Sequence, residues 1–165
     1  LARGTGFEFV DEVKGGTIPG QFLPAIEKGV RMALEQGAVA GYQIHDVRVI
    51  VYDGKYHPVD SKEVAFVSAG KKAFMDAVAK ARPMVLEPIV NLDVTVPTEH
   101  MGDITSGLAT KPQVPLAEIS EYSNELKAVT GGRGRYSIDL SHYEAVPGNV
   151  QKQLADAYKP KHEED

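Results

Sequence analysis

The 165-residue sequence predicts an α/β or α+β protein organised in two halves. Short segments with alternating apolar residues, typical of strands, take turns with longer segments whose apolar residues recur at helical spacing. A stretch bounded by prolines, Arg82 to Pro88, separates two such series. With 42% hydrophobic and 25% charged residues, the composition is that of an ordinary globular chain with a sizeable core.

The first half begins as strand, helix and strand. Phe7 to Val10 is expected to form a short strand, and Val47 to Tyr52 alternates as a second one. The helix between them has Pro24 in its first turn and Gly37 at its stop. Its apolar positions are Phe22, Ile26, Val30, Ala33 and Leu34.

A second helix ends the first half. Asp60 or Ser61 is expected to cap its N-terminus, with Glu63 in the first turn as in a capping box. Gly70 falls on the apolar stripe and would allow close packing of a neighbouring helix. The other stripe positions are Val64, Val67, Phe74, Val78 and Ala81.

The second half shows the same alternation of strands and helices. The expected elements are a strand at 90–96, a short helix at 101–108, a helix at 116–129, a strand at 136–140 and a last helix that ends before Pro160. Gly131 and Gly132 stand where a helix stop is expected, and Asn149 is the expected cap of the last helix.

Charge and composition exclude several function classes. Lys and Arg total 18 against 23 Asp and Glu, a net charge of −5, so any contact with nucleic acid has to be local. The absence of cysteine excludes disulfides, thiolate metal sites and a cysteine nucleophile. No apolar run approaches the length of a membrane span, and the first residues carry no signal-peptide pattern.

Catalytic and metal signatures are also absent. No nucleotide-binding glycine loop, nucleophile elbow or zinc-protease motif occurs. None of the histidines pairs with another at ligand spacing, which argues against a metal site. His57, Asp60 and Ser61 could be drawn as a hydrolase constellation, but Asp60 and Ser61 are better used to satisfy the first N–H groups of the helix that follows.

Two exposed segments are candidates for binding nucleic acid. In GGRGRY, residues 131–136, a helix stop plus a turn explains the glycines, and Arg133 and Arg135 are left to meet phosphate. In DGKYHPVDS, residues 53–61, Lys55, Tyr56 and His57 can stack on or hydrogen-bond a nucleotide, and Pro58 stiffens the backbone behind them. The alternative for both segments is an ordinary exposed connection.

Several blocks of the sequence resemble elongation factor G, a ribosomal translocase. The most specific are YHPVDS, LEPI and GRGRYSIDLSHYEAVP, and the resemblance runs from Gly4 to about Tyr158. It implies an α+β chain with a ribosomal-protein-S5-like fourth domain over residues 1–86. A ferredoxin-like βαββαβ fifth domain with a C-terminal helix and tail is implied for residues 87–165.

The resemblance also implies a function at the ribosome, with the chain as the C-terminal part of a GTP-dependent translocase. A tip loop would enter the decoding centre and meet the tRNA–mRNA; its residues are Gly54, Lys55, Tyr56, His57, Pro58, Asp60 and Ser61. Arg133 and Arg135 would be ribosomal RNA contacts of the fifth domain, near the large-subunit GTPase-associated region. The chain itself is expected to be a cytoplasmic monomer without catalytic residues, cofactor, metal or membrane partner. GTP and Mg would belong to a GTPase domain outside this sequence.

The sequence departs from the family pattern in several places. The GTPase domain and a Gly-rich second tip loop are missing. Only Ala109 to Gln113 separate Leu108 from Val114, too few for the central hairpin of the fifth domain, so about 20 to 30 residues are expected to be missing there. Lys127, where many members have Arg, indicates a divergent paralogue. The alternatives are a ribosome-recycling or ribosome-protection paralogue on the same scaffold, a general RNA-binding module, and a small-molecule enzyme that uses His57 and Asp60.

Overall fold

The chain forms two compact units in the computed structural model, which describes residues 1–59, 61–107 and 113–158. Unit 1 comprises Leu1–Val85 and the segment from Gly148 onward, and unit 2 comprises Leu86–Pro147. The expected boundary, after residue 86, lies one residue from this division. The last helix, which was expected in the second half, groups with unit 1 instead.

A pair of parallel strands forms the sheet of unit 1. Strand β1 (Phe7–Asp11) pairs with β2 (Val47–Val51) over their full length, close to the two predicted strands. Asp46, just before β2, has a left-handed backbone, with φ at 60°. Its Oδ1 accepts a hydrogen bond of 2.9 Å from the Gly6 amide, so the carboxylate ties the starts of the two strands together. The amides of Gly6 and Gly4 lower the pKa of Asp46, because they stabilise its charged form.

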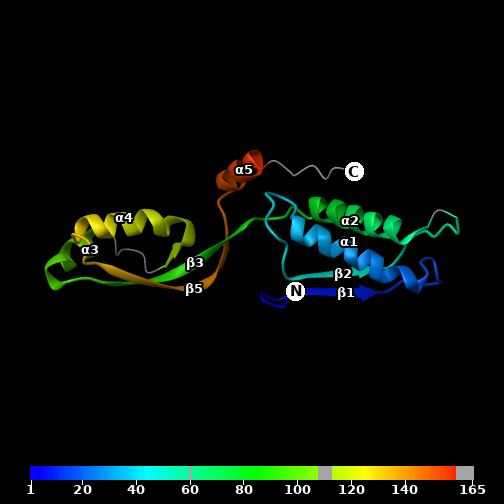
Figure 1. Ribbon diagram of the computed structural model, residues 1–165, viewed down its shortest axis with the longest axis horizontal. Helices are drawn as coiled ribbons and strands as arrows, with labels where there is room; N and C mark the ends of the chain where they lie inside the picture. The colour runs from blue at the N-terminus through cyan, green and yellow to red at the C-terminus, as the bar shows by residue number, and fades with distance from the viewer. Residues whose placement is uncertain (60, 108–112, 159–165) are drawn as a thin grey trace. The chain divides into compact units, whose positions relative to one another are not determined.

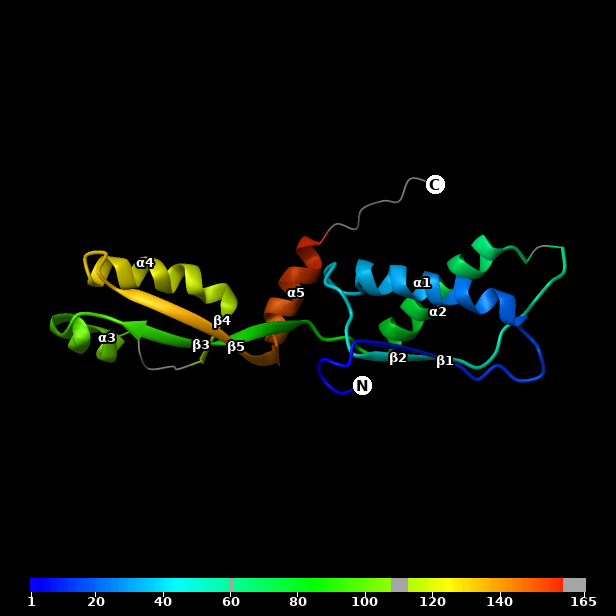
Figure 2. The same ribbon diagram turned by 60° about the horizontal axis from the view of Figure 1, so that its bottom comes forward.

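Two helices lie on one side of this sheet (Figures 1 and 2). Helix α1 (Leu23–Gln36) follows a single 3₁₀ turn, and Gly37 ends it with φ at 74° and its amide bonded to the Ala33 carbonyl, as predicted. Helix α2 is Glu63–Lys80. The buried core of unit 1 lies mostly on these helices and consists of Ile18, Phe22, Ala25, Ile26, Val30, Ala33, Leu34, Phe66, Phe74 and Val85.

The buried face of α2 differs from the predicted stripe at both ends. Phe66, Gly70 and Phe74 are buried, one turn apart. Val64 is 78% exposed, because two residues span about 200° of a helix and Val64 therefore lies on a different side from Phe66. Ala81, the last predicted position, is the exposed C-cap residue.

The two helices approach each other closely, as was predicted from the position of Gly70 on the apolar stripe. A Cβ atom on Gly70 would lie 2.7 Å from the Ile26 carbonyl oxygen, and one on Gly29 would lie 2.0 Å from the Val67 carbonyl oxygen. Both distances are shorter than any ordinary carbon–oxygen contact. Only glycine therefore fits at these two positions of the crossing.

Unit 2 contains a three-stranded antiparallel sheet. Strand β3 (Leu86–Thr95) lies between β4 (Gln113–Pro115) and β5 (Arg135–Ala145). Helices α3 (Met101–Gly107) and α4 (Ile119–Val129) complete the unit, each preceded by a 3₁₀ turn. Its buried residues include Ile89, Val90, Ile104, Ile119, Leu126 and Thr130. Strand β4 was not predicted, because three residues are too few to show alternation.

The two edge strands of the sheet in unit 2 are exposed or short. Every residue of β5 is exposed, and β4 pairs with only three residues of β3. The hairpin that we expected to be missing falls at Leu108 to Val114, and residues 108–112 lie outside the described part of the chain.

Helix α5 (Gly148–Ala157) belongs to unit 1 through hydrogen bonds to the chain before Leu86. The Gln151 side chain accepts from the Val85 amide at 3.0 Å and donates to the Pro83 carbonyl at 3.2 Å. The helix begins one residue before its predicted cap, Asn149, and ends before Pro160 as predicted. In the described ranges, no helix is long and apolar enough to cross a membrane.

We predict that Gly29→Ala lowers the free energy of unfolding by about 3 kcal/mol or more, because the added methyl group meets the backbone of α2 and not a movable side chain. Urea unfolding monitored by circular dichroism measures this loss. Gly20→Ala is the matched control: a Cβ there has nothing within 4 Å, so its effect should be neutral or slightly stabilising. Equal stability of Gly29→Ala and the wild type would contradict the close helix crossing.

Candidate functional site

The predicted tip loop connects β2 to α2 at one end of unit 1. The connection before α1 lies at the same end (Figures 1 and 2). Lys55, Tyr56, His57 and Pro58 are all exposed, as expected for a tip. Asp60 lies outside the described residues.

Tyr56 is joined to the core by a stack of aromatic rings. Its ring centroid is 5.8 Å from that of Phe22, at an interplanar angle of 33°. Phe22 stacks in turn on Phe66 of α2, with 4.4 Å between centroids and an angle of 20°. Phe22 and Phe66 are buried, whereas Tyr56 remains 40% exposed. The tip is therefore packed against residues at the N-terminal ends of both helices.

Gly54 gives the loop a second contact with the core. A Cβ at this position would lie 2.5 Å from Cδ1 of Ile18, which is 6% exposed. The Gly54 amide donates to the Asp53 carboxylate at 2.8 Å. The loop backbone therefore passes directly over Ile18 before it reaches Lys55 and Tyr56.

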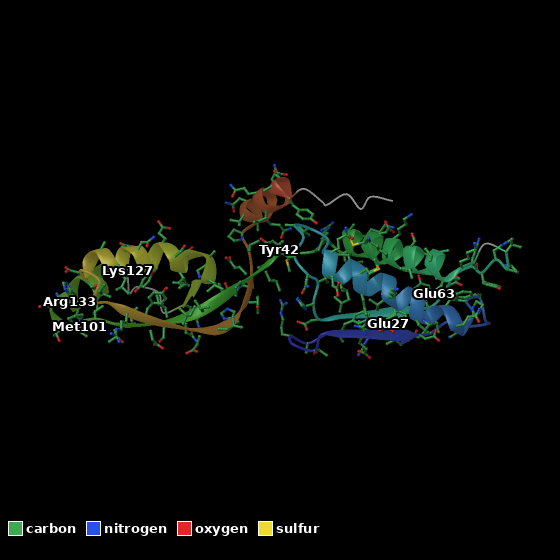
Figure 3. All side chains as sticks on the ribbon, in the orientation of Figure 1. Glu27, Tyr42, Glu63, Met101, Lys127 and Arg133 are labelled. Atoms are coloured by element: carbon green, nitrogen blue, oxygen red, sulfur yellow. The ribbon has the colours of Figure 1, made fainter. Side chains whose placement is uncertain are left out.

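Ser61 closes the loop and does not cap the helix. Its hydroxyl oxygen accepts a 2.8 Å hydrogen bond from the His57 amide, and its own amide donates to the His57 carbonyl at 3.0 Å. Helix α2 has Lys62 as its N-cap residue, without a side-chain cap bond, and Glu63 in its first turn (Figure 3). The predicted capping box is therefore wrong for Ser61, because the hydroxyl oxygen is committed to the His57 amide four residues earlier.

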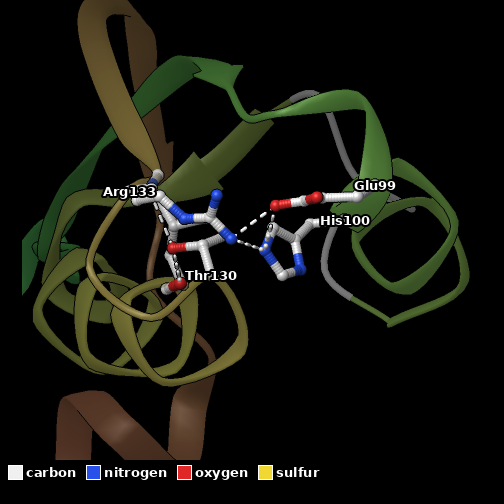
Figure 4. A network of polar contacts seen from close by, with 6 residues as sticks. Glu99, His100, Thr130 and Arg133 are labelled. Carbon is white, nitrogen blue, oxygen red and sulfur yellow. Dashed lines mark hydrogen bonds and ion pairs between the residues drawn. The ribbon is translucent and has the colours of Figure 1, made fainter.

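In unit 2, Arg133 is held by two neighbours (Figure 4). Its Nη2 forms an ion pair with Glu99 Oε1 at 2.5 Å and lies 2.9 Å from His100 Nε2. Because arginine can only donate, His100 Nε2 is the acceptor and the ring proton of a neutral imidazole lies on Nδ1. Arg133 was expected to be left for phosphate; in the structure its guanidinium is paired with Glu99, although both side chains are 58% exposed, and a phosphate contact stays a prediction. Figure 3 shows Arg133 at the end of unit 2 that also carries Lys127 and Met101.

Thr130 orders the turn that carries Arg133. Its side chain is fully buried, donates to the Leu126 carbonyl at 2.7 Å and accepts from the Gly134 amide at 2.8 Å. Gly131 and Gly132 both have positive φ, which a helix stop of this kind requires. The turn is therefore built as the sequence predicted, and a buried threonine connects its two sides.

Other polar residues of unit 2 lie on or near the exposed strand β5, where Ser141 Oγ is 2.9 Å from His142 Nδ1 and His142 Nε2 is 2.8 Å from Glu144 Oε1. Arg135 begins β5, opposite Thr95, and is exposed. The Tyr122 hydroxyl oxygen is buried without a hydrogen-bond partner in the described part of unit 2, and burial, with a smaller contribution from Glu125, raises the pKa of Tyr122. Among the residues that the structure describes, no cluster of three His, Cys, Asp or Glu could hold a metal ion.

Two family models match the chain, and both describe parts of a translation elongation factor. The model for elongation factor G, domain IV, matches residues 1–82, and the model for the elongation factor G C-terminus matches residues 109–154. Together they cover more than half of the chain. The chain therefore belongs to the elongation factor G family, and the predicted fold class, an S5-like domain followed by a ferredoxin-like domain, is confirmed.

Curated relatives and a solved structure agree with this assignment. The chain is 42% identical to elongation factor G of Aquifex pyrophilus and 40% identical to an elongation factor G-like protein of Thermotoga maritima, over 93% of its length in each case. It covers 24% and 25% of those proteins, so it spans about a quarter of their length. A crystal structure of a protein from Thermus thermophilus is similar over 92% of this chain and 26% of that one, with 36% identity and a TM-score of 0.75.

The alignment to the Aquifex protein is longer than the part of this chain that it covers. The match to the Aquifex protein spans 171 positions, whereas 93% of 165 residues is about 153. About 18 positions of the relative therefore have no counterpart in this chain.

Sequence reasoning missed the groups that hold the candidate residues in place. Phe22 was expected as an ordinary apolar helix position, Phe66 was not among the expected stripe positions, and no local pattern connects either with Tyr56. Glu99 and His100 precede Arg133 by more than thirty residues and carry no motif. Their roles come from tertiary contacts alone.

We predict that Thr130→Val lowers the stability of unit 2 by about 1–3 kcal/mol, because it keeps the shape but leaves the partly buried Gly134 amide without its acceptor. Hydrogen exchange of the Gly134 amide and urea unfolding measure the effect. Thr105→Val is the control: this exposed hydroxyl only donates to helix carbonyls, so its loss should change stability by less than about 0.5 kcal/mol. Unchanged exchange at Gly134 would contradict this role of Thr130.

Proposed function

We propose that the chain is the ribosome-contacting part of an elongation factor G that promotes GTP-dependent tRNA–mRNA translocation. The loop of residues 53–61 enters the decoding centre, and His57 makes the central contact with the tRNA–mRNA. Unit 2 lies against the RNA of the large-subunit GTPase-associated region. The family membership supports this proposal, since the relatives are named as elongation factors.

The observation that carries the proposal is the exposure of His57 between two fixed points. Tyr56 on one side packs against Phe22, and Ser61 binds both backbone groups of His57. A side chain that only covered the core would not be exposed, and a side chain on a loose loop would lose conformational entropy on binding. An exposed residue on an ordered loop suits a contact made at little entropic cost.

The proposed role is electrostatic and mechanical, with no bond made or broken by this chain. Contacts that exist only after tRNA–mRNA movement would favour the post-translocation state, which is the requirement for shifting a population. GTP and Mg act in a domain outside these residues. The net charge of −5 agrees with contacts confined to local surfaces, and the factor acts as a cytoplasmic monomer on the ribosome.

We predict that His57→Ala in the full-length factor slows tRNA–mRNA movement about 5- to 150-fold, with ribosome-stimulated GTP hydrolysis near normal. This range corresponds to the loss of one base-stacking contact of about 1–3 kcal/mol. A stopped-flow assay with labelled mRNA measures the movement, and Val64→Ala, at an exposed position on α2, is the control.

Unchanged movement with His57→Ala would remove His57 from the mechanism. Normal movement together with impaired splitting of ribosomes into subunits would instead assign the chain to a recycling factor on the same scaffold.

We also predict different effects for the two arginines near the turn of unit 2. Arg135→Ala should weaken ribosome binding and reduce the slope of log affinity against log salt by about 0.7–0.9, the value for one lost phosphate contact. Arg133→Ala should change the slope less, because Glu99 is paired with that guanidinium and competes with phosphate for it. Binding measured between about 50 and 200 mM salt tests this, with Lys80→Ala, which removes a cation paired with Asp76 on α2, as the control. Equal slopes for Arg135→Ala and the wild type would exclude Arg135 as an RNA contact.

A further inference from the structure

We infer that Tyr56 and Ser61 are positioning residues of the tip, which fix the place where His57 emerges and do not themselves hold the ribosomal partner. This inference rests on the proposed function of His57. It also revises the sequence analysis, in which Tyr56 was one of three groups available to stack on a nucleotide.

The Tyr56 ring already has an aromatic partner within the protein. It lies against Phe22 in a tilted contact, with 5.8 Å between centroids, and Phe22 in turn stacks on Phe66 at 4.4 Å. Since Phe22 and Phe66 are 9% and 7% exposed, they cannot move outward with Tyr56 without opening the core. Stacking of Tyr56 between two bases would require it to leave Phe22, whereas its present contact needs no rearrangement.

Ser61 fixes the other side of His57. The two hydrogen bonds between Ser61 and the backbone of His57 close a ring of five residues. Pro58 lies inside this ring and restricts one backbone dihedral further. The direction of the His57 Cα–Cβ bond is therefore set by Tyr56 before it and by the Ser61 ring after it.

The anchors also connect the tip to both helices. Phe22 immediately precedes α1, and Phe66 lies in the first turn of α2. Gly54 passes over Ile18, which precedes α1 as well. A displacement of either helix end would thus move the whole loop together. A loop that positions His57 requires this coupling, whereas a residue that only contacts the ribosomal partner does not.

The first test uses the full chain without ribosomes. Hydrogen exchange measured by mass spectrometry on peptides covering residues 53–61 should be at least about fivefold faster in Tyr56→Ala and Ser61→Ala than in the wild type. Tyr56→Phe keeps the ring and Ser61→Thr keeps the hydroxyl, so both should stay within about twofold of the wild type. Unfolding midpoints are recorded for each variant, and Phe22→Leu, which leaves Tyr56 in place but removes its partner ring, should also accelerate exchange. Unchanged exchange in Tyr56→Ala and Phe22→Leu overturns the anchoring.

The second test uses the full-length factor and a double-mutant cycle. Tyr56→Ala should slow tRNA–mRNA movement at least about fivefold with His57 present, but less than about twofold when added to His57→Ala, because it acts through His57. Equal factors in both backgrounds, or a Tyr56→Phe variant as slow as Tyr56→Ala, would show that Tyr56 contacts the partner directly and would overturn the inference. If His57→Ala moves tRNA–mRNA at the normal rate, the proposed function fails, while the exchange experiment still decides whether Tyr56 and Ser61 order the loop.

Discussion

The contact on which unit 1 depends is the backbone approach of α1 to α2 at Gly29 and Gly70. Side chains at these positions would set the helix axes further apart, because helix separation follows the size of the residues at the contact. With glycine at both, Phe22 and Phe66 come close enough to stack. The aromatic pair then offers Tyr56 a flat apolar surface at the end of the unit. The order of the tip is therefore a consequence of packing between two helices whose midpoints lie about two turns away.

Unit 2 depends on hydrogen bonds more than on close packing. Its sheet has three strands in the described residues, and β5 is exposed along its whole length, so apolar burial comes mainly from β3, α3 and α4. The fully buried Thr130 hydroxyl connects the end of α4 to the strand that follows. The same turn presents Arg133 to Glu99 and His100. The candidate residues of the two units therefore differ in their surroundings: His57 is exposed on an ordered loop of unit 1, whereas the exposed Arg133 of unit 2 is paired with Glu99.

Much of the fold could be predicted from the sequence, because the signals that define it are local. Alternation found β1 and β2, helical spacing found α1, and Gly37 marked the end of that helix. The features that were not predicted depend on tertiary contacts, which the local sequence does not show. Phe66 faces the core and Val64 does not, although both are apolar residues of the same first turn, and only the position of α1 decides between them. The exposure of the tip followed from its composition, but its anchors are separated from it by up to about thirty-five residues of chain and carry no pattern of their own.

Ser61 shows how the loop and the helix compete for one hydroxyl group. An N-cap serine typically contributes about 1 kcal/mol to a helix, and the sequence places Ser61 close to where such a cap would act. The structure instead bonds it to the His57 amide and leaves α2 without a side-chain cap. Since the His57 amide is exposed and water could satisfy it, this bond contributes less to global stability than a cap would. The arrangement favours a defined loop over a more stable helix start, as expected where the direction of the neighbouring side chain matters more than stability.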